Sequence, residues 1–215
     1  MAEATVTREI EERKERRASG LSVAGGLLLL VGALAAVLRL ANLNAIPLAP
    51  GEAQEALAVW RFWQPESSGP AFDYSPAYFS LTSLLMLVLG DGEAVMRVVP
   101  AVFGVALPLL PWFWRRYLGV VGALTASLLL AVSPIATITA RTAGGAAIAL
   151  TAVLLVLIAW TRYLDEGRRG WLVAVFGALG LGLASGPLFL SGLATAGLAW
   201  LAQARIGPQL SLRAS

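Results

Sequence analysis

The sequence predicts an all-α integral membrane protein with about six transmembrane helices and two juxtamembrane helices on its outer face. Two observations lead to this prediction: the composition and the length of the apolar runs. Of the 215 residues, 58% are hydrophobic and 13% are charged. The apolar residues gather in runs of about 20, the length that an α-helix needs to cross a bilayer. Such runs are too long for barrel strands, and helices satisfy their own backbone polar groups in lipid.

The apolar runs lie at about 20–40, 76–90, 94–114, 119–139, 144–161, 171–185 and 187–204. The run 76–90 differs from the others, because at 1.5 Å per residue it would measure ~22 Å against a hydrocarbon core of ~30 Å. Ser80, Thr82 and Ser83 also interrupt its apolar surface. We therefore expect 76–90 to lie in or dip into the outer leaflet, and the other six runs to cross.

Positive charge supports the same topology. With six spans, 12 of the 16 basic residues face the cytoplasm, among them Arg115, Arg116, Arg168 and Arg169. The four on the outer side are Arg39, Arg61, Arg97 and Arg141. If 76–90 crossed, the count would be seven inside and nine outside, against the positive-inside rule. We therefore expect a multi-pass protein of the cell (cytoplasmic) membrane with both termini in the cytoplasm.

The spans divide the chain into three parts. Residues 1–19 carry Glu9/Arg13 and Glu12/Arg16 at i,i+4 spacing, which predicts a charged cytoplasmic helix. Residues 20–204 form the transmembrane module, and 205–215 form a cytoplasmic tail. The module contains one large outer loop, about residues 41–93.

The outer loop should hold both juxtamembrane helices. In 51–64, one helical face carries Ala53, Ala56, Leu57, Trp60 and Trp63, which suits a helix at headgroup level. The dipeptide Ser75-Pro76 predicts the N-cap and first position of the second helix.

Missing residue types exclude several functions. The chain has no cysteine and no histidine, so disulfides, cysteine-ligated metals and a His-ligated haem or chlorophyll are excluded. The net charge of +3 comes from basic residues that sit mainly at span ends, which argues against nucleic-acid binding. We expect no cofactor and no metal site. The expected partners are membrane lipids and other membrane protein subunits.

Four stretches carry a resemblance to a known superfamily. They are LRLANLNAIPLAPGEAQEA after the first run, MRVVPAVFGVALPLLPWFWRRYLG (96–119), GALTASLLLAVSPIATITAR (122–141) and RYLDEGRRGWL (162–172). Together they resemble the N-terminal half of the GT-C glycosyltransferases, most closely the flippase-activity-associated family related to O-mannosyl and aminoarabinose transferases. The resemblance implies a GT-C-like N-terminal module and, in active members, sugar transfer from a polyprenyl phosphate.

The positions that carry the chemistry in that family differ here. Where the resemblance implies an Asp-Glu pair, a His-Gly-Pro-like element, an Arg-His-Asp motif and a Lys-Glu pair, this chain has Gly51-Glu52, Tyr74-Ser75-Pro76, Gly144-Gly145 and Ala184-Ser185. Glycine supplies neither a base nor a side-chain ligand. The chain also ends at Ser215, where such enzymes continue into an acceptor-binding domain. The resemblance therefore implies a degenerate and truncated scaffold.

Glu52 and Arg141 are the candidate site residues, and each has an alternative interpretation. Glu52 is the remaining acid at the catalytic corner, or a helix N-terminal acid favoured by the helix dipole. Arg141 would bind a lipid phosphate, or extend to the headgroups without a specific ligand. Glu93 and Arg97, four residues apart, are expected to pair with each other.

Small residues in 171–187 suggest a packing face. Gly177, Gly182 and Gly186 lie along one predicted helix, the last two at GxxxG spacing. Such residues let helices approach closely, either inside this bundle or against another subunit.

These observations favour a protein without enzyme activity, a GT-C-like structural or accessory subunit of a larger membrane complex. Two alternatives remain open. One is an active glycosyltransferase that uses a polyprenyl-phosphate-linked sugar with Glu52 as its base, and the other is a helper of a lipid-linked-sugar flippase.

Overall fold

The computed structural model describes residues 23–45, 47–64 and 75–213, with side chains described as far as residue 201, and its regular structure in these ranges is helical throughout. The first helix, Val23–Leu40, is called the N-terminal helix below. The others are α2 (Pro50–Phe62), α3 (Pro76–Leu89), α4 (Glu93–Ala106), η1 (Leu107–Trp114), α5 (Arg115–Val132), α6 (Pro134–Arg141), α7 (Ala146–Glu166), α8 (Arg169–Leu183) and α9 (Pro187–Arg213). The predicted all-α class is confirmed for the described residues.

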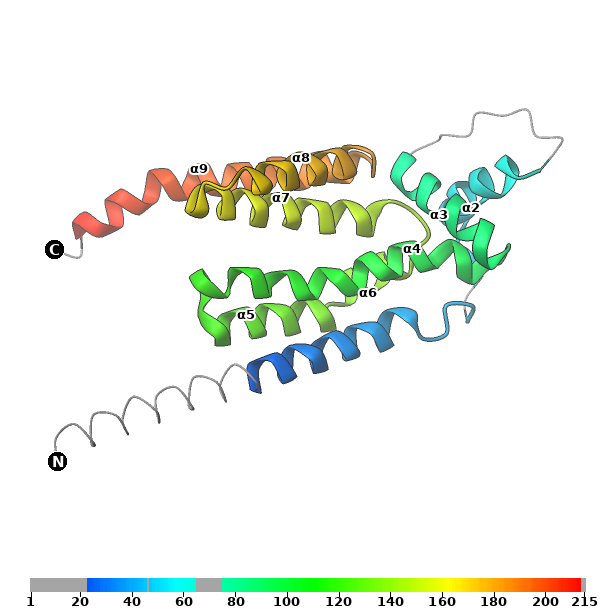
Figure 1. Ribbon diagram of the computed structural model, residues 1–215, viewed down its shortest axis with the longest axis horizontal. Helices are drawn as coiled ribbons and strands as arrows, with labels where there is room; N and C mark the ends of the chain where they lie inside the picture. The colour runs from blue at the N-terminus through cyan, green and yellow to red at the C-terminus, as the bar shows by residue number, and fades with distance from the viewer. Residues whose placement is uncertain (1–22, 46, 65–74, 214–215) are drawn as a thin grey trace.

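The long helices lie lengthwise beside one another and the chain runs back and forth along them (Figure 1). The α2 and α3 helices lie together at one end, and the start of the N-terminal helix and the end of α9 lie at the other. Val23–Leu40, Glu93–Val132 and Ala146–Glu166 are long and apolar enough to cross a membrane, and Pro76–Leu89, Arg169–Leu183 and Pro187–Leu201 are shorter apolar helices. These helices mark the chain as a membrane protein.

Proline and glycine shape the stretch Glu93–Val132, which does not form one straight rod. Pro108 and Pro111 lack the backbone N–H that an α-helix needs, and this part of the chain is the 3₁₀ helix η1. Gly119 then takes φ 71° and ψ 170°, outside the helical region, and α5 packs back against η1. Pro134 separates α5 from α6, so the predicted run 119–139 becomes two helices.

The two helices predicted for the outer loop, α2 and α3, form close to their predicted positions. Ser75 caps α3, because its Oγ accepts a hydrogen bond from the backbone N–H of Tyr78 at 3.3 Å, and Pro76 occupies the first turn. At 14 residues, α3 measures about 21 Å, shorter than the hydrocarbon core. Its place in the outer leaflet stays a prediction. The helix predicted over 1–19 lies outside the described residues, and α9 continues past the predicted boundary at 204.

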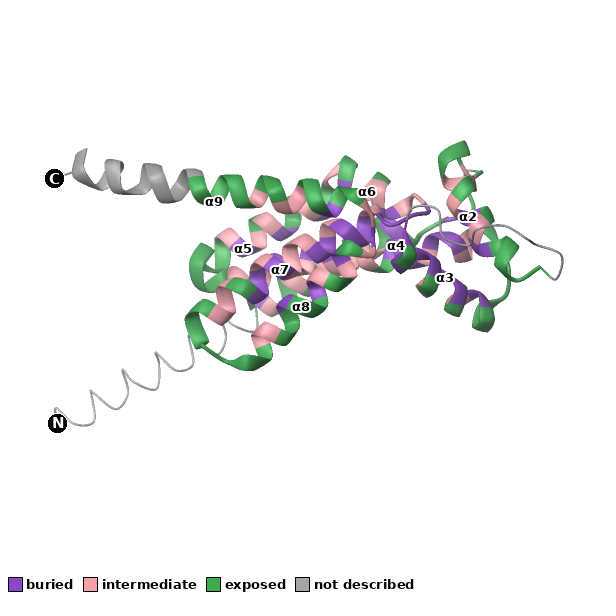
Figure 2. Ribbon diagram, turned by 90° about the horizontal axis from the view of Figure 1, so that it is seen from above, coloured by how far each residue is buried: buried purple, intermediate pink, exposed green. Residues whose placement is uncertain are grey.

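Buried residues concentrate on α3, α4 and α7, whereas α9 is exposed along most of its described length (Figure 2). One cluster joins α2, α3 and α4 through residues such as Val59, Tyr78 and Met96. A second joins α7, α8 and α9 through Ala152, Ala178 and Phe189. The first cluster therefore fixes the juxtamembrane helices on the end of the bundle.

Arg39 connects the N-terminal helix to α5. Its fully buried side chain donates from Nη2 to the carbonyl of Leu130 and from Nη1 to the carbonyl of Ala131, both at 2.9 Å. The residue that would normally donate to Leu130 is Pro134, which has no N–H. A buried carbonyl without a donor costs several kcal/mol in lipid, so Arg39 compensates for the break before α6.

Gly104 allows α4 to pack directly on α6. A Cβ atom at this position would lie 2.2 Å from the Cβ of Ala140 and 3.2 Å from Cδ of Arg39. The Arg39 hydrogen bonds and the α4–α6 contact therefore share one site where no side chain fits on α4.

We predict that Gly104→Ala destabilises the protein by about 1–3 kcal/mol through overpacking. Its thermal unfolding in detergent should shift to lower temperature. The matched control is Gly25→Ala in the N-terminal helix, where an added Cβ meets no atom within 4 Å. Equal midpoints for the two variants would contradict the close contact between α4 and α6.

Candidate functional site

Glu52, the candidate base, forms an ion pair with Arg97. Its Oε2 lies 2.7 Å from Nη2 of Arg97, and the side chains are 12% and 6% exposed. Glu52 lies in the first turn of α2, where a negative charge also favours the helix dipole. The carboxylate at the predicted catalytic position is thus engaged with a buried cation.

Arg97 holds the segment before α2 as well. Nη1 donates to the carbonyl of Leu43 at 2.8 Å, and Nη2 donates to the carbonyl of Pro47 at 3.2 Å. The expected pair between Glu93 and Arg97 is therefore corrected: the ion pair of Arg97 is with Glu52. The two residues share a helix, but the buried guanidinium points toward the segment 43–52, which has carbonyls to satisfy, while Glu93 lines a pocket.

Glu55 is a second acid in the region where the start of α2, the start of α3 and the loop before α7 meet, which is called the corner below. The sequence analysis did not single out Glu55 as a site residue. It lies one helical turn after Glu52 on α2, and its Oε2 is buried. Both carboxylate oxygens would lie 3.2 Å from a Cβ atom at Gly144. The i,i+3 spacing of Glu52 and Glu55 was the available signal, since it puts both acids on one side of α2.

Tyr78 of α3 is buried beside the corner and packs in the cluster with α2 and α4. Its hydroxyl donates to the carbonyl of Met96 at 2.9 Å. Burial raises the pKa of the Tyr78 hydroxyl, and the nearby charges of Glu55 and Glu52 raise it further. The side chain therefore stays a neutral hydrogen-bond donor at physiological pH.

Gly145 leaves no space for a side chain. A Cβ atom there would lie 2.1 Å from the backbone oxygen of Ser185 and 2.2 Å from Oγ of Ser75. The backbone N–H of Ala77 also donates to the carbonyl of Ala184 at 2.8 Å, which joins the start of α3 to the end of α8. Three of the four positions that differ from the family therefore lie in contact: Ser75, Gly145 and Ser185. Together they leave no free space beside Gly145.

Arg141 binds the end of the N-terminal helix. Nη1 donates to the carbonyls of Leu38 and Ala41 at 3.0 and 2.8 Å, and Nη2 donates to the carbonyl of Asn42 at 3.0 Å. Leu38 belongs to the last turn of the N-terminal helix and Ala41 and Asn42 follow it, where carbonyls lack the next helical N–H; the carbonyl of Asn42 also accepts from the N–H of Ala45 at 3.1 Å. Three of the four N–H groups on the two terminal nitrogens of Arg141 therefore bind acceptors inside the protein. Binding of a lipid phosphate by Arg141 stays a prediction.

The three glycines of the predicted packing face have different surroundings. A Cβ at Gly182 would lie 2.1 Å from the ring of Phe189, which is packing inside this chain. Gly186 has φ 113° between α8 and α9, a backbone conformation that favours glycine. A Cβ at Gly177 would meet no atom within 4 Å, so of the three Gly177 keeps open space beside it.

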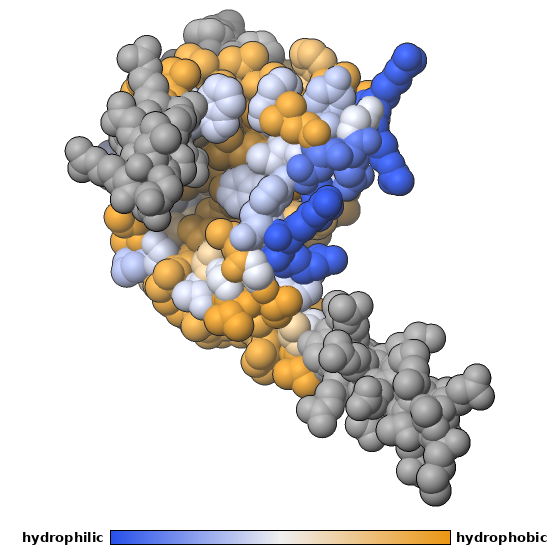
Figure 3. Space-filling model, turned by 90° about the vertical axis from the view of Figure 1, so that its left-hand side faces the viewer, coloured by the Kyte–Doolittle hydropathy of each residue, from blue (hydrophilic) through white to orange (hydrophobic). Residues whose placement is uncertain are grey.

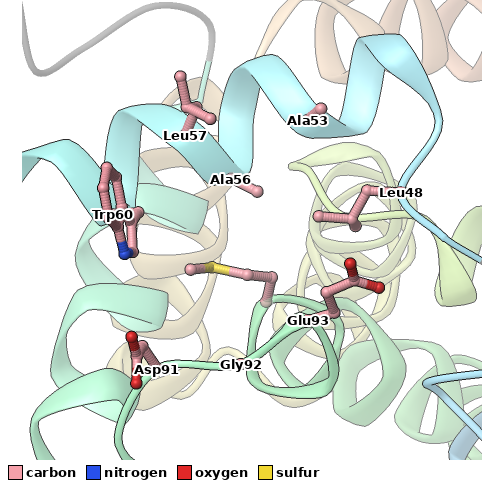
Figure 4. A pocket seen from close by; sticks show the side chains of 9 residues that line it. Leu48, Ala53, Ala56, Leu57, Trp60, Asp91, Gly92 and Glu93 are labelled. Carbon is pink, nitrogen blue, oxygen red and sulfur yellow. The ribbon is translucent and has the colours of Figure 1, made fainter.

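A pocket of about 330 Å³ lies next to this corner, between α2 and the start of α4. Figure 4 shows Ala53, Ala56, Leu57 and Trp60 along the α2 wall and Asp91 and Glu93 on the opposite side. The predicted apolar face of α2 thus lines a pocket with an apolar wall and an acidic rim. Glu52 and Glu55 are not among its lining residues.

We predict unequal effects of removing either member of the Glu52–Arg97 pair. Glu52→Gln leaves Arg97 its two carbonyl acceptors. Arg97→Gln leaves Glu52 as an uncompensated, nearly buried charge and releases the carbonyls of Leu43 and Pro47, a class of change that costs about 3–5 kcal/mol. Thermal unfolding in detergent should rank the variants wild type, Glu52→Gln, Arg97→Gln in falling midpoint.

The double variant Glu52→Gln/Arg97→Gln completes the cycle. It should be more stable than the sum of the single changes implies, because no unpaired charge remains. Additive effects would contradict a direct interaction between the two side chains.

No solved structure and no curated protein matches the chain with significance. A family model does match: residues 73–206 fit the model of dolichyl-phosphate-mannose-protein mannosyltransferases, a GT-C family. The match covers α3 to α8 and α9 as far as residue 206, and it includes Ser75, Gly144, Gly145 and Ser185. The chain therefore belongs to the dolichyl-phosphate-mannose-protein mannosyltransferase family.

Proposed function

We propose that this chain is a catalytically degenerate member of the mannosyltransferase family that serves as a structural or accessory subunit of a larger membrane complex. The observation that carries the proposal is the corner between α2, α3 and α7. Glu52, the acid at the position that the family resemblance makes catalytic, is paired with Arg97, and the space beside Gly145 is filled by Ser75 and the backbone of Ser185.

The chemistry of sugar transfer explains why this arrangement matters. A general base must reach the acceptor hydroxyl within hydrogen-bond distance. Glu52 instead accepts from a buried arginine, and Glu55 lies against the backbone of Gly144. A side chain restored at Gly145 would collide with backbone as well as with a serine, so the loss of a functional group there is tied to closer packing.

The exposed faces of the helices support an accessory role. Large apolar side chains point outward on α8 and α9, for example Val173, Phe176, Leu198 and Trp200. In a membrane these faces contact lipid or neighbouring helices. Van der Waals contact and close fit would then provide the association of subunits.

The acidic pocket beside α2 supports the alternative of an active transferase. Asp91 and Glu93 with Trp60 offer hydrogen-bond acceptors and an aromatic surface, the groups that bind sugars. Under this alternative Glu52 would still act as base. A flippase helper would instead change the amounts of lipid-linked sugar in cells without catalysing transfer itself.

We further propose six spans with both termini in the cytoplasm. The N-terminal helix, α4 with η1, α5 with α6, α7, α8 and α9 would cross, while α2 and α3 lie at the outer surface. Support comes from the arrangement of the elements: the junctions of η1 with α5 and of α7 with α8, which carry Arg115, Arg116, Arg168 and Arg169, lie at the end of the bundle away from α2 and α3 (Figure 1). Basic loops favour the cytoplasmic side.

The topology predicts a specific labelling pattern. The sequence contains no cysteine, so a single introduced thiol reports its own side. Gln54→Cys on the exposed side of α2 should react with a membrane-impermeant maleimide on intact cells. Arg116→Cys, whose native side chain is 66% exposed, should react only after permeabilisation. The reverse pattern would overturn the orientation.

The proposed loss of activity predicts no transfer of mannose from a polyprenyl-phosphate donor by the purified wild-type protein. The informative variant is Gly51→Asp, which restores the Asp-Glu pair where an added Cβ meets no atom within 4 Å. We expect it to fold and to remain inactive, because the corner at Gly145 stays filled. Wild-type turnover that disappears in folded Glu52→Gln would establish the active alternative.

The accessory role predicts that the protein solubilised in mild detergent migrates with other membrane subunits in fixed stoichiometry. Native electrophoresis with mass spectrometry of the band measures this. A monodisperse species that contains only this chain would contradict the proposal.

A further inference from the structure

A second pocket lies at the other end of the bundle, between η1, α7 and α8. Its volume is about 390 Å³. Phe113 contributes from η1, Leu155 and Ile158 from α7, and Trp171, Gly177 and Leu181 from α8. Apart from the indole N–H of Trp171, these side chains are apolar. From Trp171 to Leu181 the wall spans ten residues of helix, about 15 Å, so the pocket follows α8 along the bundle.

Polar side chains meet at one end of this pocket. Arg162 donates from Nη2 to the carbonyl of Phe113 and from Nη1 to Glu166, both at 3.0 Å. The indole N–H of Trp171 donates to the other oxygen of Glu166 at 2.9 Å. Two lining residues, Phe113 and Trp171, are thus bonded directly to the charged loop region. The apolar pocket and the charged end form one continuous site.

The charged end has a surplus of arginine. Among the residues that the structure describes, its arginines are Arg115, Arg116, Arg162, Arg168 and Arg169, against the two acids Asp165 and Glu166. The acids are shared, since Glu166 pairs with Arg162 and lies 3.8 Å from Arg168, and Asp165 lies 3.8 Å from Arg116. Figure 3 shows strongly hydrophilic side chains gathered on one side of this end of the molecule. The surplus is three positive charges on an exposed surface.

Arg168 and Arg169 are the best placed of these cations. Arg168 is 79% exposed, and Arg169, also exposed, begins α8 two residues before Trp171. Arg168 Nε lies 3.8 Å from the Glu166 oxygen that accepts from the indole N–H of Trp171, so Arg168 stands close to the Trp171 end of the pocket, and Arg169 follows it in the chain. A guanidinium group binds phosphate oxygens through two parallel hydrogen bonds, which suits a ligand with a phosphodiester head.

We propose that this site binds an anionic phospholipid, with one acyl chain along α8 in the pocket and the phosphate between Arg168, Arg169 and the neighbouring arginines. The two halves of the site match the two halves of such a lipid: an apolar groove about 15 Å long and, near its Trp171 end, a cluster of exposed arginines. The charge surplus distinguishes this ligand from a partner helix, which would need the groove but not the arginines. The site is independent of transferase activity.

The proposal is tested by lipid binding to the purified full chain in detergent, measured by native mass spectrometry. The probes are phosphatidylglycerol, which is anionic, and phosphatidylcholine with the same acyl chains. Wild-type protein should bind phosphatidylglycerol at least tenfold more tightly. Arg168→Gln/Arg169→Gln should lower that affinity roughly tenfold or more and leave phosphatidylcholine unchanged, because each arginine near a headgroup contributes to the attraction.

A space-filling variant tests the pocket itself. Gly177 lines the pocket and an added Cβ there meets no atom within 4 Å, so Gly177→Leu should fold and occupy the acyl-chain groove. Gly180→Leu on the same helix is the matched control, since Gly180 is equally open but does not line the pocket. Gly177→Leu should weaken phosphatidylglycerol binding several-fold, and Gly180→Leu should not.

Three outcomes would overturn the proposal. Equal affinity for phosphatidylglycerol and phosphatidylcholine would show that the arginines do not select an anionic headgroup. Unchanged phosphatidylglycerol binding in Gly177→Leu would show that the acyl chain does not occupy the pocket. Loss of a co-migrating subunit in that variant would show that the pocket binds a protein partner instead. Displacement of the lipid by millimolar inorganic phosphate would show that the arginines alone bind, without the groove.

Discussion

The structure depends on arginine side chains that donate to backbone carbonyls with no helical partner. Lipid offers no hydrogen bonds, so each helix end or proline break inside the bundle needs a donor from the protein. Arg39 donates to carbonyls at the end of α5, and Arg141 donates to carbonyls at the end of the N-terminal helix. Arg97 donates to carbonyls of the segment that follows the N-terminal helix. The N-terminal helix has only 17% of its span buried, so these bonds contribute much of what holds it to the bundle.

The same interactions shape the corner where the family resemblance implies catalysis. Arg97 needs an acceptor for its buried charge, and Glu52 supplies it. Glycine at 144 and 145 lets the loop before α7 come close to Glu55, Ser75 and Ser185, and these contacts replace the space that functional side chains would need. In the function that we propose, loss of chemistry and gain of packing would be two aspects of one arrangement, which is why we favour a structural role for this member of the mannosyltransferase family.

The two ends of the bundle differ in the burial and pairing of their charged side chains. At the end with α2 and α3, charges are paired and buried, and the neighbouring pocket has an acidic rim. At the opposite end, the described arginines outnumber the described acids, and most of them stand exposed near one end of an apolar pocket. Burial explains the contrast, because a buried cation requires a partner while an exposed one can remain available for a ligand. A lipid site at the second end would anchor the bundle at the membrane surface without involving the closed corner.

The sequence by itself determined the class, the helix positions and several boundaries. Long apolar runs require helices in lipid, Ser75-Pro76 carries its own capping chemistry, and the family could be recognised from local strings. Only the tertiary structure decided how the polar residues pair. Spacing along α4 suggested Glu93 for Arg97, but the guanidinium binds Glu52, 45 residues away, because the carbonyls of Leu43 and Pro47 and that carboxylate lie together only in the folded chain. Likewise, the glycine pattern of α8 could not separate Gly182, which contacts Phe189, from Gly177, which faces open space, since the distinction depends on where neighbouring helices lie.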